Sequence, residues 1–123
     1  MQTKNVSFDP NGDKLWINII FNGIIIASYK YVLWEAQSNH RVDEREGNNQ
    51  NPDDDKYFLP LPTGSNKGRL IDVRARFIGI DMDNKKYKIT VEIYQGDNKL
   101  GEVFVSGNAS GASQYDQLFI KLV

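Results

Sequence analysis

The stretch LWINIIFNGIIIASYKYVLWE, from Leu15 to Glu35, is dominated by β-branched and aromatic residues and determines the predicted fold. Before Asn22, apolar residues stand at every second position, which is the pattern of a β-strand with one buried face. Asn22-Gly23 favours a two-residue hairpin turn, because a type I′ turn needs positive φ at both central residues. The stretch therefore predicts two antiparallel strands joined at Asn22-Gly23.

Pairing across this turn would give the hairpin two apolar faces. One face, with Ile19 opposite Ile26, would supply the core, whereas the other sets Trp16 beside Tyr29. The outward face of a sandwich is ordinarily polar, and a large exposed apolar patch often marks an interaction surface. The second face therefore predicts a partner-binding surface made of Trp16, Asn18, Ile20, Ile25, Tyr29 and Tyr31. The alternative is that another segment of the chain folds across this face and buries it.

Two strands in the second half of the sequence, residues 70–80 and 87–95, show the same alternation. A loop at residues 81–85 would set Phe77 opposite Ile89, and it would set Arg74 opposite Glu92 as a favourable cross-strand charge pair. We therefore predict a second hairpin here. A three-residue loop after Gln95 would place the next strand with Val103 opposite Ile93, and a closing strand is expected at Leu118, Ile120 and Leu122.

The whole chain reads as strands separated by turn clusters, without a convincing helical period. It predicts an all-β fold, a two-sheet antiparallel β-sandwich of seven or eight strands. Immunoglobulin-like, C2-like and jelly-roll wirings all fit this pattern. With 123 residues the chain is expected to be a single domain, 1–123. Residues 41–56 contain three consecutive aspartates and few apolar residues, so we expect a mobile polar loop there.

Composition excludes several classes of function. Fifteen basic and sixteen acidic residues leave a net charge of -1, which gives no electrostatic basis for nucleic-acid binding. The absence of cysteine excludes disulfides and thiolate metal sites. The opening MQTKNVSF lacks the apolar run of a signal peptide, and polar residues interrupt the stretch from Leu15 to Trp34. We expect no membrane insertion and a cytoplasmic protein, or a secreted one if a leader has been removed.

Two acidic turns raise the possibility of calcium binding, because Asp9 and Asp13, like Asp81 and Asp83, are spaced as in calcium loops. The spacing of the glycine and the absence of a distal acid do not match a complete loop. Such aspartates more commonly stabilise turns through bonds to nearby backbone. These four residues are therefore weak candidates, and we expect no cofactor.

An enzyme is difficult to build from this sequence. His40 is the one histidine, and no G-x-S-x-G nucleophile motif is present. Glu35 is the only acid embedded in apolar sequence, and a chain of this length has little room for a catalytic cleft. We therefore expect a non-enzymatic protein-binding or assembly module that recognises a protein partner or a second copy of itself. The alternatives are a carbohydrate-binding module that uses the same aromatic residues, and a C2-like calcium-binding domain.

Overall fold

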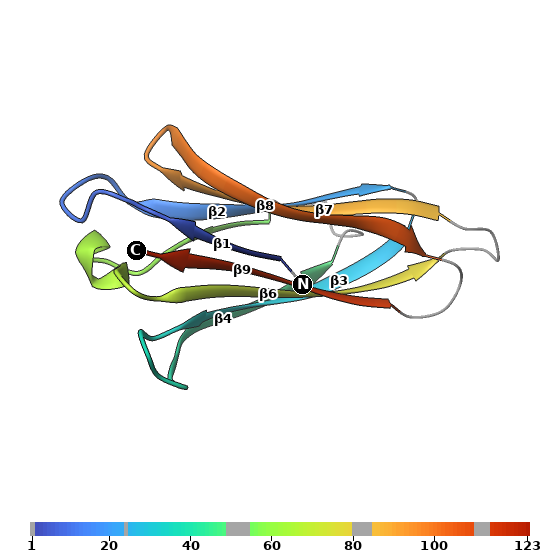
Figure 1. Cartoon of the computed structure of the whole chain (residues 1–123), viewed down its shortest axis with the longest axis horizontal. Helices are drawn as coiled ribbons and strands as arrows, with labels where there is room; N and C mark the ends of the chain where they lie inside the picture. The colour runs from blue at the N-terminus through green and yellow to red at the C-terminus, as the bar shows by residue number, and fades with distance from the viewer. Residues whose placement is uncertain (1, 24, 49–54, 80–84, 110–113) are drawn as a thin grey trace.

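The computed structural model describes residues 2–23, 25–48, 55–79, 85–109 and 114–123. These residues form two facing β-sheets (Figure 1), which confirms the predicted all-β sandwich. The five-stranded sheet contains, in spatial order, β1 (Gln2–Val6), β9 (Gln114–Leu122), β6 (Leu70–Gly79), β3 (Ile25–Trp34) and β4 (Arg41–Asn48). The four-stranded sheet contains, in spatial order, β5 (Lys56–Phe58), β2 (Leu15–Gly23), β7 (Lys85–Gln95) and β8 (Asn98–Ala109). A short 3-10 helix, η1 (Thr63–Asn66), follows β5.

The strand count and one pairing differ from the prediction. The described part of the chain has nine strands rather than seven or eight. The added strands are short or polar, and such strands give a weak alternation signal. The sheets are not entirely antiparallel either, because β1 runs parallel to β9. That arrangement lets the N-terminal strand cover the edge of β9 without a tight turn between the two strands.

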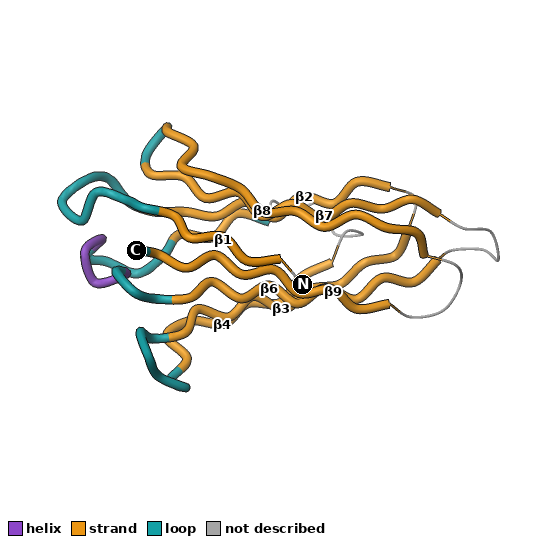
Figure 2. The backbone as a smooth tube through the Cα atoms, viewed as in Figure 1, coloured by secondary structure: helices purple, strands orange, loops and turns teal. Residues whose placement is uncertain are grey.

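Most connections carry the chain from one sheet to the other, as the tube in Figure 2 lets the reader follow. Among the described strands, only the consecutive pairs β3–β4 and β7–β8 are neighbours within one sheet. Consecutive strands in β proteins more commonly pair with each other. Two of the predicted hairpins do not form, because the chain crosses to the other sheet between β2 and β3 and again between β6 and β7.

The predicted hairpin at Asn22-Gly23 is wrong. β2 ends at Gly23 and pairs with β5 and β7, whereas β3 begins at Ile25 in the opposite sheet and pairs with β4 and β6. The hydrophobic effect explains the difference, because a flat hairpin would leave one of its two apolar faces in water. In facing sheets, Ile19 from β2 and Tyr31 from β3 both point into the core.

The predicted pairing of residues 70–80 with residues 87–95 is wrong for the same reason. β6 and β7 lie in different sheets, and Phe77 stacks on Tyr87 across the core with ring centroids 4.0 Å apart. Arg74 therefore does not meet Glu92. The Arg74 guanidinium lies 3.3 Å from the Asp72 carboxylate on its own strand.

The predicted hairpin of β7 and β8 is present, but in a different register. Val103 lies opposite Val91 rather than Ile93, and a register shift occurs between Ile93 and Tyr94. The strands are separated by Gly96 and Asp97 alone, and Gly96 has a positive φ of 57°. Two-residue turns with positive φ match the twist of paired strands, so this turn replaces the expected three-residue loop.

The predicted mobile loop at residues 41–56 contains strand at both of its ends. Arg41–Asn48 form β4 at the edge of the five-stranded sheet, and Lys56 begins β5. Charged side chains are suited to an edge strand because they discourage pairing with other molecules. Polarity alone therefore did not distinguish a loop from an edge strand. Residues 49–54 lie outside the described residues.

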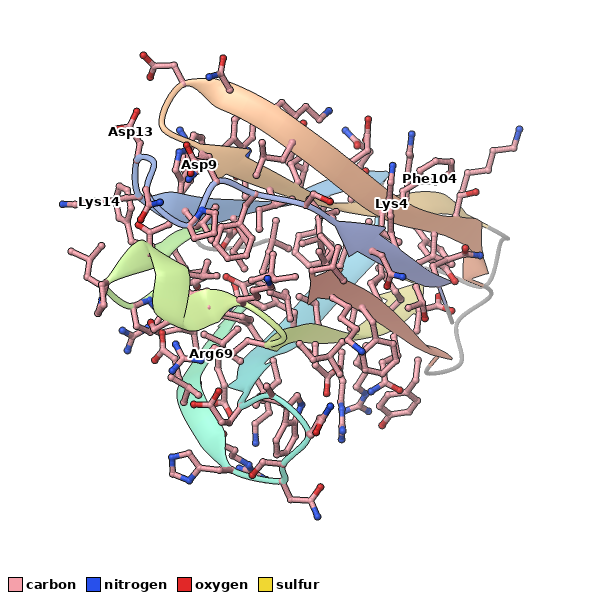
Figure 3. All side chains as sticks on the ribbon, turned by 60° about the vertical axis from the view of Figure 1, so that its left-hand side comes forward. Lys4, Asp9, Asp13, Lys14, Arg69 and Phe104 are labelled. Atoms are coloured by element: carbon pink, nitrogen blue, oxygen red, sulfur yellow. The ribbon has the colours of Figure 1, made fainter. Side chains whose placement is uncertain are left out.

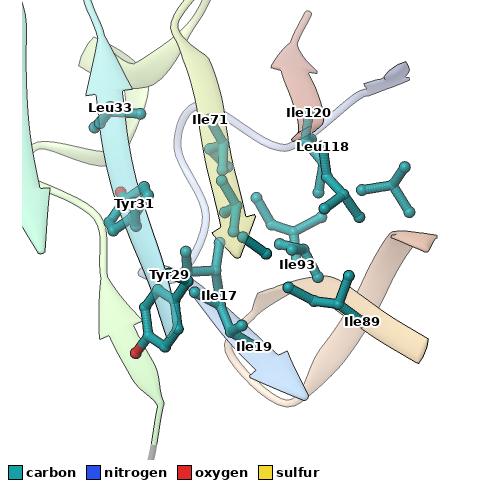
Figure 4. Packing of buried hydrophobic residues seen from close by; sticks show 14 of the residues in the cluster. Ile17, Ile19, Tyr29, Tyr31, Leu33, Ile71, Ile89, Ile93, Leu118 and Ile120 are labelled. Atoms are coloured by element: carbon teal, nitrogen blue, oxygen red, sulfur yellow. The ribbon is translucent and has the colours of Figure 1, made fainter. Parts of the chain in front are cut away.

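One hydrophobic core fills the space between the sheets (Figure 4). The alternation predicted for the C-terminal strand is confirmed, since Leu118, Ile120 and Leu122 are buried. Aromatic rings extend the core toward the β4–β5 side of the sandwich. Tyr57 stacks on Tyr31 with centroids 5.7 Å apart, which connects the edge strand of one sheet to the interior of the other.

Two buried tyrosines link parts of the chain through their hydroxyl groups. The Tyr87 hydroxyl on β7 donates to the Asp116 carboxylate on β9 at 2.6 Å, and so joins the two sheets. The Tyr29 hydroxyl donates to Asp55 at 2.6 Å. Burial and the hydrogen bond to Asp55 raise the pKa of Tyr29 above its usual range. In contrast, the Tyr31 hydroxyl is buried and has no hydrogen-bond partner within the described part of the chain.

This contrast predicts different effects of removing single hydroxyl groups. Tyr87→Phe should lower the free energy of unfolding by about 1–3 kcal/mol, because the substitution removes a bond to a charged acceptor. Tyr31→Phe should leave stability unchanged or raise it slightly, since no hydrogen bond is lost. Urea denaturation of both variants measures the difference. A cost for Tyr31→Phe equal to that of Tyr87→Phe would show that the hydroxyl of Tyr31 has a partner after all.

Candidate functional site

The structure divides the predicted partner-binding surface between the inside and the outside of the sandwich. Tyr29 and Tyr31 are only 4% and 0% exposed, because their strand lies opposite β2 rather than beside it. Trp16, Asn18 and Ile20 are partly exposed on the four-stranded sheet. The remaining predicted member, Ile25, has a side chain outside the described part of the structure. The predicted face therefore does not form as one surface.

The outward side of the four-stranded sheet nevertheless carries an aromatic surface of different composition. Strand register places Phe58, Trp16 and Tyr94 next to one another on β5, β2 and β7. Ile20 and Phe104 lie further along the same side, on β2 and β8. Phe58 is 66% exposed and Phe104 is 49% exposed. We call these five residues the outer aromatic face.

Trp16 lies between Phe58 and Tyr94 and is held in one orientation. Its ring stacks on Tyr94 with centroids 4.1 Å apart and an interplanar angle of 9°. Its Nε1 donates to the carbonyl oxygen of Gly96 at 2.8 Å. The ammonium of Lys56, on the strand at the other side, lies 5.7 Å from the ring centroid. Tyr94 therefore covers one face of the indole, and the hydrogen bond to Gly96 fixes the orientation of the ring.

Lysines also lie over the two most exposed rings of the outer aromatic face. The ammonium group of Lys14 is 5.9 Å from the Phe58 centroid, and that of Lys88 is 4.4 Å from the Phe104 centroid. Such cation–π contacts contribute about 0.5–1 kcal/mol at exposed sites and keep long side chains near the rings. Figure 3 shows Phe104 at one end of this side of the molecule and Lys14 at the other.

A groove of about 540 Å³ opens beside Phe58. Its lining residues come from the β1–β2 connection, β2, β5 and the β7–β8 turn; they are Asp13, Lys14, Trp16, Lys56, Phe58, Gly96 and Asp97. Two lysines and two aspartates thus surround two aromatic rings. A surface of this kind is suited to apolar contact with a mixed-charge rim.

Sequence reasoning missed Phe58, Tyr94 and Phe104 as members of this surface. A usable signal existed for two of them, because Tyr94 and Phe104 occupy positions whose neighbours in sequence point inward. An aromatic residue at an outward position of a strand is a recognisable departure from the usual polar side. Phe58 gave no such signal, since its strand is only three residues long.

The structure gives the acidic turn at Asp9 and Asp13 a structural explanation. The Asp9 carboxylate accepts a hydrogen bond from the Asn11 backbone N–H at 2.9 Å, as turn-forming aspartates commonly do. The side chain of Gln95 donates to the backbone carbonyls of Asp9 and Asp13 at 2.7 and 3.0 Å. Among the described residues, no group of three metal-binding side chains comes together. The other two candidates, Asp81 and Asp83, lie outside the described residues.

Neither Glu35 nor His40 lies in the environment that a catalytic acid or base needs. Glu35 forms a two-pronged pair with Arg69, with distances of 3.2 Å to Nε and 3.0 Å to an Nη atom. The hydrogen bonds from Arg69 lower the pKa of Glu35 to about 2. A general acid at neutral pH needs a raised pKa instead. His40 is exposed in the connection between β3 and β4.

Comparison of the chain with models of known protein families, with curated proteins and with solved structures found no match. Within the part of the chain that the structure describes, no helix has the length and apolar character needed to cross a bilayer. The function must therefore be inferred from the geometry of the outer surfaces.

The Glu35–Arg69 pair predicts a specific dependence of stability on pH. Because folding lowers the pKa of Glu35 from about 4.3 to about 2, the pair stabilises the fold above pH 4.3 and loses this effect as the pH falls toward 2. Glu35→Gln should therefore melt at a lower temperature than the wild type at pH 7, and the gap should close in acid. Thermal denaturation between pH 7 and pH 2 measures this difference in melting temperature. Glu46→Gln, which removes the charge of an exposed glutamate on β4, is the control. A gap that stays constant would contradict the role of the pair.

Proposed function

We propose that the protein is a non-enzymatic assembly module that associates with a second copy of itself through the outer aromatic face. The observation that carries the proposal is the exposure of Phe58 and Phe104 on the same side of the four-stranded sheet. Large aromatic side chains bury a large area with few rotatable bonds, and they are enriched at the centres of protein interfaces. The stacked pair of Trp16 and Tyr94 supplies a preorganised centre between them.

Charge balance favours a second copy as the occupant. The described residues on this side carry five lysines (14, 56, 86, 88 and 99) and four carboxylates (13, 92, 97 and 102). A two-fold interface brings the same surface together twice, so a strongly charged face would repel itself. A nearly neutral face with both signs of charge can pair without a large net repulsion.

The two alternative functions expected from the sequence, carbohydrate binding by Trp16 and calcium binding by the acidic turn at Asp9, have less support. A sugar platform on Trp16 would have to use a single ring face, because Tyr94 stacks on the other face of this indole. A C2-like calcium function needs several oxygen ligands directed at one point. The Asp9 carboxylate instead accepts a hydrogen bond from the Asn11 backbone N–H.

The proposal predicts concentration-dependent dimerisation that surface substitutions disrupt. Phe58→Ser and Phe104→Ser should each weaken the dimer by about tenfold or more, since each removes a large exposed ring from the interface. Sedimentation velocity over a range of protein concentrations measures the dissociation constant.

A matched control is available on the other sheet. Tyr115 on β9 is 70% exposed, so Tyr115→Ser removes an equally accessible ring and should leave the dissociation constant unchanged. Circular dichroism checks that each variant is folded. A protein that stays monomeric at every concentration, or a dimer that only Tyr115→Ser weakens, would contradict the proposal.

A further inference from the structure

A second groove lies on the outward side of the five-stranded sheet, on the face opposite to the outer aromatic face. It has a volume of about 490 Å³, which is within the usual range for small-molecule sites. Its floor is formed by β3, β6 and β9. One wall is the β3–β4 connection, which leaves the plane of the sheet in Figure 2.

An apolar strip runs along the floor of this groove. Trp34 on β3 is paired with Leu70 on β6, and Phe119 on β9 lies beside the next outward position of β6. All three side chains are partly exposed and line the groove. The guanidinium of Arg41 lies over the Trp34 ring at 5.4 Å but is not a lining residue. Trp34 itself lines the groove, so part of the indole is accessible from it.

A buried carboxylate orients the polar groups around this strip. Asp72 is 1% exposed although it points to the outward side of β6. Its Oδ2 accepts a hydrogen bond from Trp34 Nε1 at 3.0 Å, and its Oδ1 accepts one from Gln117 Nε2 at 3.0 Å. Arg74 adds a third contact at 3.3 Å. A buried charge needs such partners, and in return it fixes the positions of the indole and the amide.

The rim of the groove supplies further hydrogen-bonding groups. The β3–β4 connection contributes Gln37, Ser38 and Asn39, and β9 contributes Lys121. These side chains offer both donors and acceptors, whereas the floor between them is apolar. A ligand that fits this distribution has a flat apolar face and a polar edge.

We infer that this groove binds a carbohydrate, with the apolar face of a sugar ring packed on Trp34 and Phe119. The C–H groups on one face of a pyranose are slightly positive and complement the negative face of an aromatic ring. The hydroxyl groups at the edge of the sugar meet Gln117, Arg74 and the side chains of the rim. Asp72 acts as a positioning residue, since it holds Trp34 and Gln117 in place. A purely apolar ligand would leave the remaining hydrogen-bonding capacity of these polar groups unsatisfied.

Nuclear magnetic resonance can test this inference with a panel of sugars, because the chain has only two tryptophans to follow. The indole N–H of Trp34 bonds to Asp72, and that of Trp16 bonds to Gly96, so their signals report separately on the two faces. The labelled protein is titrated with cellotetraose, xylotetraose, maltotetraose, chitotriose and tetragalacturonate. At least one sugar should shift the Trp34 signal in a saturable way and leave the Trp16 signal in place.

Two variants and a control complete the test, with the affinity for that sugar measured by isothermal titration calorimetry because Trp34→Ala lacks the Trp34 signal. Trp34→Ala should abolish binding of that sugar, and Phe119→Ala should weaken it by about tenfold without removing a partner of Asp72. Tyr115→Ala, which removes an exposed ring from the same sheet outside the groove, should bind as the wild type does. The inference is overturned if no sugar moves the Trp34 signal, if the Trp16 signal responds instead, or if Phe119→Ala binds with unchanged affinity. None of these outcomes depends on whether the protein dimerises through its other face.

Discussion

The passage of the chain from one sheet to the other between Gly23 and Ile25 is the constraint on which the rest of the structure depends. It places two strongly apolar strands in facing sheets, so that Ile19 and Tyr31 enter the same interior. It also separates Trp16 from Tyr29, with one on the outer surface and the other in the core. The inward side chains of β2 and β3 form the core, so only their outward side chains remain to build a binding surface on each sheet.

The alternation of side chains along single strands could be predicted from the sequence, whereas the pairing of strands could not. Period-two patterns identified the inward residues of β2, β6, β7 and β9 correctly. For residues 70–80 and 87–95 the pattern is equally compatible with a hairpin and with two strands that face each other, since both arrangements bury the same residues. For the first stretch the two arrangements differ, because a hairpin would expose Tyr29 and Tyr31. Asn22-Gly23 and the Arg74–Glu92 match both indicated hairpins, yet the burial of large apolar faces outweighs a turn preference or one exposed ion pair.

The two candidate sites could be predicted only in part, for the same reason. Outward aromatic residues such as Tyr94, Phe104 and Phe119 could be recognised in principle, because their sequence neighbours point inward. Their grouping into surfaces could not be predicted, since Phe58 lies beside Trp16, and Phe119 lines the same groove as Trp34, only through the pairing of strands distant in sequence. The burial of Asp72 was equally hidden, because it depends on Trp34 and Gln117 from two other strands. Both candidate sites therefore depend on the pairing of strands that are distant in the sequence.

The most direct test of this account is the set of nuclear Overhauser contacts between backbone protons of neighbouring strands in the isotope-labelled protein. The account predicts contacts from Asn18 to Glu92 on one side and to Lys56 on the other, and contacts from Tyr31 to Val73. Contacts between Ile19 and Ile26, which a hairpin at Asn22-Gly23 would bring together, would contradict it. That result would return Tyr29 and Tyr31 to the surface beside Trp16.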